Sequence, residues 1–105
     1  MTTRVRLCAR SELPVGSCRR FEVGDTAIVV VACADGVHAL EDRCSHEDYL
    51  LSEGEVDAEA CEIECWKHGS MFSLRTGEPE SLPATRPVQV YEVEVDGDDV
   101  IGVFP

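Results

Sequence analysis

Strand-like alternation of apolar and polar positions marks both ends of this chain. Val5 and Leu7 alternate with arginines, and "VQVYEVEV" followed by "DGDD" and "VIGVF" has the pattern of a hairpin. The β-branched run "TAIVVVACA" predicts a strand buried on both faces, and "DG" at 35–36 predicts a turn into "VHALE". No window shows a helical stripe. We therefore expect an all-β fold, a small antiparallel β-sandwich or barrel.

The length of 105 residues indicates a single domain, 1–105, without an internal linker. Its longest apolar run, 27–34, is much shorter than the roughly 20 residues of a membrane helix. The first ten residues carry charge and lack the apolar core of a secretory signal. We expect a cytoplasmic monomer with no membrane contact.

The net charge of −12 is unevenly distributed. Residues 1–20 hold five arginines and one acidic residue, whereas residues 41–64 hold ten acidic residues and only Arg43 as a cation. Such a field repels phosphate backbones, so we do not expect nucleic-acid binding. The acidic stretch either steers a basic protein partner or only keeps the protein in solution.

Two short Cys/His pairs fall outside the best strand segments. Cys44 and His46 follow "VHALEDR", and Cys65 and His68 lie between "ACEIE" and "SMFSL", where a hairpin tip is expected. Without an export signal, reduced thiols and metal ligation are favoured over disulfides. Two adjacent hairpin tips would bring two sulfur and two nitrogen donors together. Tetrahedral zinc fits such a set, and so does a 2Fe–2S cluster in which one iron takes both cysteines and the other both histidines.

Cys44-Ser-His46 followed by Cys65-Trp-Lys-His68-Gly69 resembles the C-x-H…C-x-x-H motif of Rieske proteins. "DGVHALEDRCSH", "GSMFSLRTGEP" and "LPATRPVQVYEVEVDGDDV" resemble further family segments in the right order. The chain is most similar to Rieske ferredoxins of ring-hydroxylating dioxygenases. The resemblance implies one 2Fe–2S cluster on Cys44, His46, Cys65 and His68, and a cluster-binding part at about 41–84.

Departures from the high-potential members of this family have consequences for the reduction potential. Tyr49 and Lys67 occupy the positions of a disulfide that joins the two cluster loops in those members, so that bridge is impossible here. Phe72 aligns with a tyrosine that donates to a ligand sulfur, whereas Ser70 matches a serine that donates to a bridging sulfide. Hydrogen bonds of this kind stabilise the reduced cluster and raise its reduction potential. Because this chain lacks the tyrosine bond and the disulfide, we expect a potential near the low end of the Rieske range, about −150 mV.

The remaining candidate residues have simpler interpretations. We expect four cysteines to pack in the core as small apolar side chains: Cys8, Cys18, Cys33 and Cys61. Cys61 could pair with Cys65 as a ligand, but in an extended segment the two lie about 13 Å apart. His38 is expected on an exposed strand face. Trp66 is expected to cover the cluster or, alternatively, to meet a partner, and Pro83 is either a plain turn or part of a third loop over the cluster.

The resemblance implies an electron carrier rather than an enzyme. It would take one electron from a flavin-dependent NAD(P)H reductase and deliver it to a terminal non-heme iron oxygenase, and nothing in the sequence resembles a nucleophile–base pair or a phosphate loop. Alternatives are a small subunit of a larger reductase, a partner of iron–sulfur assembly enzymes, or a zinc-stapled binding module without redox activity.

Overall fold

The computed structural model describes residues 3–43, 49–66, 69–80 and 86–104. A curled six-stranded antiparallel sheet forms the larger part, with strand order β1-β9-β8-β4-β3-β2. Its strands are β1 (Thr3–Ala9), β2 (Cys18–Val23), β3 (Thr26–Cys33), β4 (Gly36–Glu41), β8 (Val90–Asp96) and β9 (Asp99–Phe104). The predicted all-β fold is therefore confirmed.

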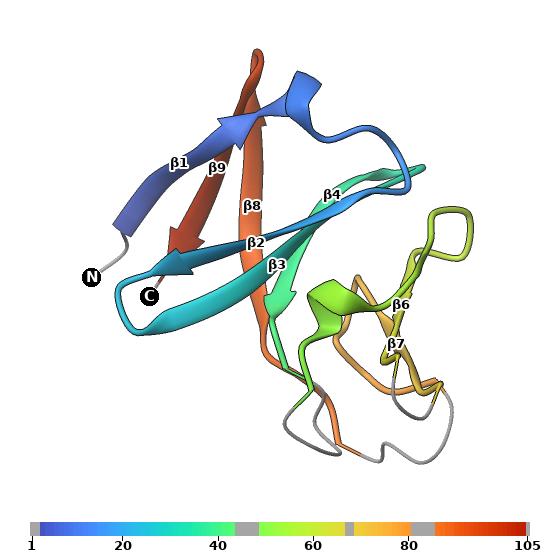
Figure 1. The fold of residues 1–105 in the computed structure, drawn as a ribbon. Coiled ribbons are helices and arrows are strands. Elements are labelled where there is room, and N and C mark those ends of the chain that lie inside the picture. Colours follow the sequence, from blue (N-terminus) through green and yellow to red (C-terminus); the bar gives the residue numbers. More distant parts are fainter. Residues whose placement is uncertain (1–2, 44–48, 67–68, 81–85, 105) are drawn as a thin grey trace.

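A three-stranded sheet packs beside one end of the large sheet (Figure 1). Its antiparallel strands are β5 (Val56–Asp57), β6 (Glu62–Glu64) and β7 (Met71–Ser73). Two short 3-10 turns complete the described elements, η1 (Arg10–Glu12) and η2 (Leu51–Glu53). Within the described ranges, no helix is long and apolar enough to cross a membrane.

Strand β3 lies at the centre of the core, as its continuous apolar sequence predicts. Its last six residues are buried, and neighbouring side chains point to opposite faces of the sheet. Val29, Val31 and Cys33 pack towards the small sheet, whereas Ile28 and Val30 pack inside the curl of the large one. One strand thus supports two apolar clusters, one under each part of the molecule.

Asp42 fixes the chain where it leaves β4 for the first Cys/His motif. Its side chain is fully buried and accepts hydrogen bonds from the Arg20 guanidinium at 2.6 Å, and from the Ser52 amide and hydroxyl at 2.7 Å each. A buried carboxylate is tolerated only when it is paired and hydrogen-bonded in this way. Asp42 thereby ties β4 to β2 and to η2.

We expect Asp42→Ala to lower the free energy of unfolding by about 3 kcal/mol, because it leaves the Ser52 amide and the Arg20 guanidinium without their buried acceptor. Chemical denaturation of the cluster-loaded protein measures this. Glu59→Ala, at an exposed position, is the matched control and should change stability by less than about 0.5 kcal/mol. Equal losses in the two variants would show that Asp42 has no anchoring role.

Candidate metal centre

The second Cys/His motif begins in a tight loop between β6 and β7. These strands pair through Glu64↔Met71, so residues 65–70 connect them as the expected hairpin tip. The Cys65 amide donates to the Ser70 carbonyl at 2.7 Å, and the Gly69 amide donates to the Cys65 carbonyl at 2.9 Å. Gly69 has a φ of 76°, a conformation that suits glycine. The backbone therefore turns sharply after Cys65, as ligation by both ends of the motif requires.

The base of this loop is buried. Cys65 is 1% exposed, and Ser70 and Phe72 are fully buried. Phe72 pairs with Ile63 across the small sheet and packs in the same apolar cluster as Cys65. The Cys65 thiol is thus shielded from water on its protein side, and the Ser70 hydroxyl is enclosed at the same loop base.

Tyr49 and Trp66 bring the described flanks of the two motifs together. Tyr49 lies three residues after His46, and Trp66 directly follows Cys65. Their rings meet edge to face, with centroids 5.2 Å apart and an interplanar angle of 83°. The described flanks of both motifs are therefore in contact across the loops. From the sequence, Tyr49 was identified only as a replacement for a disulfide cysteine. Its contact with Trp66 was not predicted, because alternation patterns do not show which loop side chains meet.

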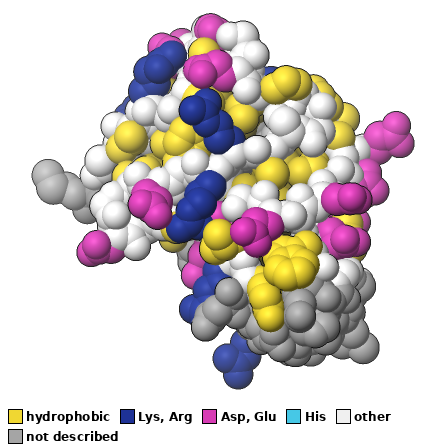
Figure 2. All heavy atoms as spheres, in the orientation of Figure 1, with side chains coloured by type: hydrophobic (Ala, Val, Ile, Leu, Met, Phe, Trp, Pro, Cys, Tyr) yellow, Lys and Arg dark blue, Asp and Glu magenta, His cyan; other side chains and the backbone are white. Residues whose placement is uncertain are grey.

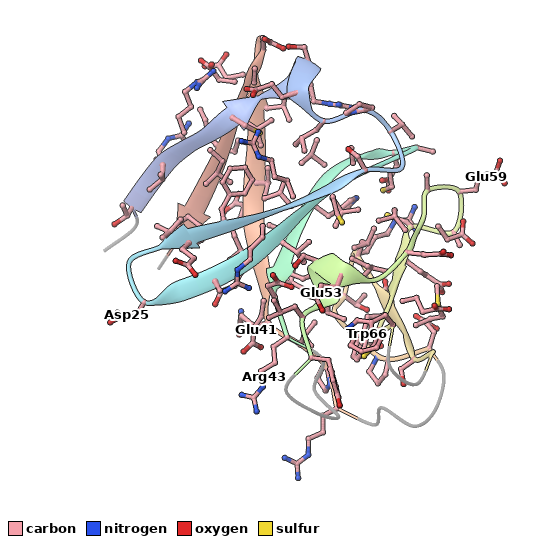
Figure 3. All side chains as sticks on the ribbon, viewed as in Figure 1. Asp25, Glu41, Arg43, Glu53, Glu59 and Trp66 are labelled. Carbon is pink, nitrogen blue, oxygen red and sulfur yellow. The ribbon has the colours of Figure 1, made fainter. Side chains whose placement is uncertain are left out.

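Trp66 is also a large apolar surface, with 47% of its area exposed. Figure 3 shows it at the end of β6 that leads into the second motif, on the side of the molecule where the first motif begins. An indole half exposed in this way is available both to shield the loops and to meet another protein.

The acidic stretch at 41–64 does not form one patch. Asp42 is buried and paired with Arg20. Glu59, which is exposed, lies at the opposite end of the small sheet from Trp66 (Figure 3). Figure 2 shows acidic side chains along the side of the small sheet and also over the large sheet, where basic side chains lie among them. Only part of the acidic charge therefore lies near the two motifs.

The predicted site residues divide into two groups. Cys44, His46, His68 and Pro83 lie outside the described residues, as do Lys67, Glu47 and Asp48. Cys65, Trp66, Ser70 and Phe72 lie together around the β6–β7 loop. The described part of the site fits a cluster held by two cysteines and two histidines. It supplies the buried Cys65 thiol in a sharply bent loop. The residue next to that thiol, Trp66, contacts Tyr49 beside the other motif.

Predictions for the other cysteines and for His38 are partly confirmed. Cys8, Cys33 and Cys61 are buried and carry free thiols, as expected of core side chains. Cys18 is only partly buried, and its thiol donates to the Ser52 carbonyl at 3.5 Å. The prediction that His38 is exposed holds only in part: it lies in β4, its side chain is 22% exposed, and its ring bonds Asp35 at 2.8 Å. The turn at Asp35 folds a partner back over the ring, which strand alternation cannot predict.

Comparison with known proteins agrees with this geometry. Residues 3–92 match the family model described as the Rieske [2Fe-2S] domain. The chain belongs to the Rieske family. The ferredoxin component of biphenyl 2,3-dioxygenase from Rhodococcus jostii (strain RHA1) is 36% identical to it, over 91% of this chain and 88% of the relative.

Solved structures give the same assignment. The ferredoxin of carbazole 1,9a-dioxygenase from Nocardioides aromaticivorans IC177 superposes with a TM-score of 0.91 and 38% identity, covering 95% of this chain and 96% of that one. A ferredoxin chain solved in a complex of reduced oxygenase and oxidized ferredoxin in carbazole 1,9a-dioxygenase has a TM-score of 0.87 and 39% identity, covering 94% and 91%.

The family membership confirms three sequence-based predictions. The large and small sheets form the Rieske fold. The cofactor of this family is a Rieske-type 2Fe–2S cluster, which exchanges one electron at a time. The chain is a Rieske ferredoxin, an electron carrier that is not itself catalytic.

Proposed function

We propose that this Rieske ferredoxin takes one electron from a flavin-dependent NAD(P)H reductase and passes it to a terminal non-heme iron oxygenase. Cys44, His46, Cys65 and His68 would hold the cluster, within a cluster-binding part at about 41–84 of the single domain 1–105. The observation that carries the proposal is the contact of Tyr49 with Trp66, since it joins the flanks of both Cys/His motifs at one end of the molecule.

The similarity to dioxygenase ferredoxins supports the choice of partners. One matched chain was solved together with its oxygenase. A carrier must reach two proteins in turn, which favours a small, transient contact over a permanent one. We also place the protein in the cytoplasm, as a monomer.

The chain's own residues would control the approach of a partner. Trp66 offers an apolar contact beside the loops, and Glu53, exposed in η2, adds negative charge on the same side (Figure 3). Glu47 and Asp48 directly follow His46 in the sequence and add two more negative charges there. Charge of this kind raises encounter rates with a basic surface, and salt screens it beyond a Debye length of roughly 8–10 Å.

Electron delivery tests this function. In stopped-flow experiments with a dioxygenase reductase and oxygenase, Glu47→Lys with Asp48→Lys should slow the second-order rate about tenfold at low salt and leave the visible spectrum unchanged. The control is Glu92→Lys with Asp96→Lys, which changes the net charge equally at exposed positions on β8. A protein that no such reductase can reduce would refute the proposed function, whereas equal rates in both variants would refute only the electrostatic contact.

Ser70→Ala should lower the reduction potential. The Ser70 hydroxyl is fully buried at the base of the 65–70 loop, and we propose that it donates to the cluster. Loss of one hydrogen bond to a charged acceptor, worth about 1.5 kcal/mol in the reduced state, corresponds to a fall of about 60 mV for one electron. Protein-film voltammetry measures it, with Ser73→Ala in β7 as the control. An unchanged potential would mean that Ser70 bonds only the protein.

A further inference from the structure

A second group of metal-binding side chains lies away from the Cys/His motifs. It consists of Cys33 at the end of β3, Asp35 in the β3–β4 turn, His38 in β4 and Cys61 just before β6. One donor atom from each of the four lies within 4.8 Å of every other. Cys61 and Cys65 flank β6 at its two ends, so this group is separated from the ligand loop by the length of that strand.

The hairpin geometry explains three of these positions. Cys33 pairs with Gly36, and Val31 pairs with His38, in the antiparallel register of β3 and β4. Because paired residues share a face, and residues two apart along a strand share it too, Cys33 and His38 project from the same face of the sheet. Asp35 in the turn then reaches both side chains.

Cys61 reaches the same point from the small sheet, at some conformational cost. Its φ of 58° is the only positive value among the described residues other than glycine. Its carbonyl accepts from the Leu74 amide at 2.9 Å, and the nearby Ala34 amide donates to the Ala58 carbonyl at 3.0 Å, which links the two sheets here. A non-glycine residue whose backbone is held in the left-handed conformation by its surroundings is typical of functional positions.

One carboxylate oxygen is the focus of the group. Asp35 Oδ1 lies 2.8 Å from Cys33 Sγ, 2.8 Å from His38 Nε2 and 3.5 Å from Cys61 Sγ. Asp35 Oδ2 instead accepts from Arg75, whose Nε and Nη2 both lie 2.8 Å away. Arg75 therefore fixes the carboxylate from outside and leaves Oδ1 directed at the two thiols and the imidazole, as a supporting residue does for a ligating carboxylate.

The proton affinities of these side chains are set by their burial and by one another. Burial raises the pKa of the Cys33 thiol, and burial and the neighbouring Cys33 raise the pKa of Cys61 to about 12. Hydrogen bonds from Cys33, His38 and Arg75 hold the pKa of Asp35 below its usual range. Both thiols are thus protonated in the metal-free protein, and zinc has to displace these protons into solvent at a cost in binding free energy.

We propose that Cys33, Asp35, His38 and Cys61 form a mononuclear Zn²⁺ site that fastens the β3–β4 hairpin of the large sheet to the small sheet. Two sulfurs, one nitrogen and one oxygen suit zinc and disfavour magnesium or calcium. With Zn–S near 2.3 Å and Zn–N or Zn–O near 2.0–2.1 Å, a tetrahedral site has donors ~3.4–3.8 Å apart. The widest pair would close by about 1 Å, and the two pairs now 2.8 Å apart, Asp35 Oδ1 with Cys33 Sγ and with His38 Nε2, would open by roughly 0.6–0.8 Å.

The charges of the four side chains and the exposure of the site are also compatible with a bound Zn²⁺ ion. The two thiolates and the Asp35 carboxylate carry three negative charges. The Zn²⁺ ion and the Arg75 guanidinium carry three positive charges, so no net charge is left at the sheet junction. Cys33 and Cys61 are each 1% exposed, whereas the side chains of His38 and Asp35 are 22% and 40% exposed. The sulfurs are thereby sheltered, and an ion can enter from the Asp35 side.

The test uses untagged, cluster-loaded protein with reduced thiols, dialysed anaerobically against micromolar Zn²⁺. Elemental analysis should find one zinc per chain in addition to two irons, and zinc should raise the unfolding temperature. X-ray absorption at the zinc edge should show two sulfur and two nitrogen or oxygen neighbours. This spectrum on the unmodified protein decides the ligand set even if a cysteine variant fails to fold.

Variants locate the site. Cys33→Ser and His38→Gln should weaken zinc binding at least about 100-fold, and Arg75→Gln about tenfold or more, while Cys8→Ser, buried in the other apolar cluster, should bind as the unmodified protein does. No stoichiometric zinc, zinc without sulfur neighbours, or full binding by Cys33→Ser and His38→Gln would overturn the proposal. So would a Cys33–Cys61 disulfide in anaerobically isolated protein, since it would assign the two thiols to each other.

Discussion

Replacing Cys65 by serine should remove nearly all of the bound iron and the visible absorbance. Cys65 is buried at the start of a loop that is closed by hydrogen bonds from the Cys65 and Gly69 amides, so the direction of its thiol is fixed. The loop sequence contains no second cysteine that could replace it as a ligand. A serine hydroxyl is a poor ligand for iron beside sulfide, because soft thiolate is what iron–sulfur clusters select. Iron, acid-labile sulfide and the visible spectrum of protein purified anaerobically measure the effect.

The controls for Cys65 are cysteines outside the four proposed cluster ligands. Cys8→Ser and Cys61→Ser should keep two irons, two sulfides and an unchanged spectrum, since both thiols are buried away from the loop. His46→Cys and His68→Cys should instead change the spectrum without simple bleaching, because they alter the ligands rather than remove a sulfur. Bleaching by Cys61→Ser alone would show that the ligand assignment is wrong.

Replacing Trp66 by alanine should weaken binding to the oxygenase by about 30-fold, or about 2 kcal/mol, as for an aromatic residue at the centre of an interface. The indole is 47% exposed and supported on one edge by Tyr49, so it presents a rigid apolar face beside the ligand loops. Calorimetric titration of the oxygenase with oxidised ferredoxin measures the change.

A matched control separates this contact from a general loss of apolar surface. Val95→Ala removes a side chain that is equally exposed, at 48%, but lies on β8 of the large sheet. It should bind the oxygenase as the unmodified protein does. Trp66→Phe should recover most of the affinity. If Trp66→Ala binds normally but shifts the spectrum or the potential, then Trp66 shields the cluster and does not contact the partner.

The sequence predicted the fold well because β-strands repeat every two residues. The run around β3 was recognised as a strand buried on both faces, and the turns at 35–36 and 96–99 were recognised from their residues. The two Cys/His motifs were found because few chemistries require that spacing. All of these signals come from residues close together in the chain, so they can be recognised in a single sequence.

Contacts between distant segments were not predictable in the same way. Asp42 was counted with the acidic surface, although it is buried against Arg20 and Ser52 from two other elements. His38 was assigned to an exposed face, although it is only partly exposed and its ring nitrogen lies within 4.8 Å of donor atoms of Asp35 and two buried cysteines. In both cases the environment of a polar side chain depends on which strands meet in space. Composition alone does not predict which strands those are.

Pulsed electron paramagnetic resonance of the reduced protein tests the central claim most directly. If Cys44, His46, Cys65 and His68 hold one 2Fe–2S cluster, the cluster electron will couple to two nitrogen nuclei of directly bound histidines, and His46→Cys or His68→Cys will remove one coupling each. A reduced cluster with no strongly coupled nitrogen, or a colourless protein that holds zinc in place of two irons, would contradict the assignment.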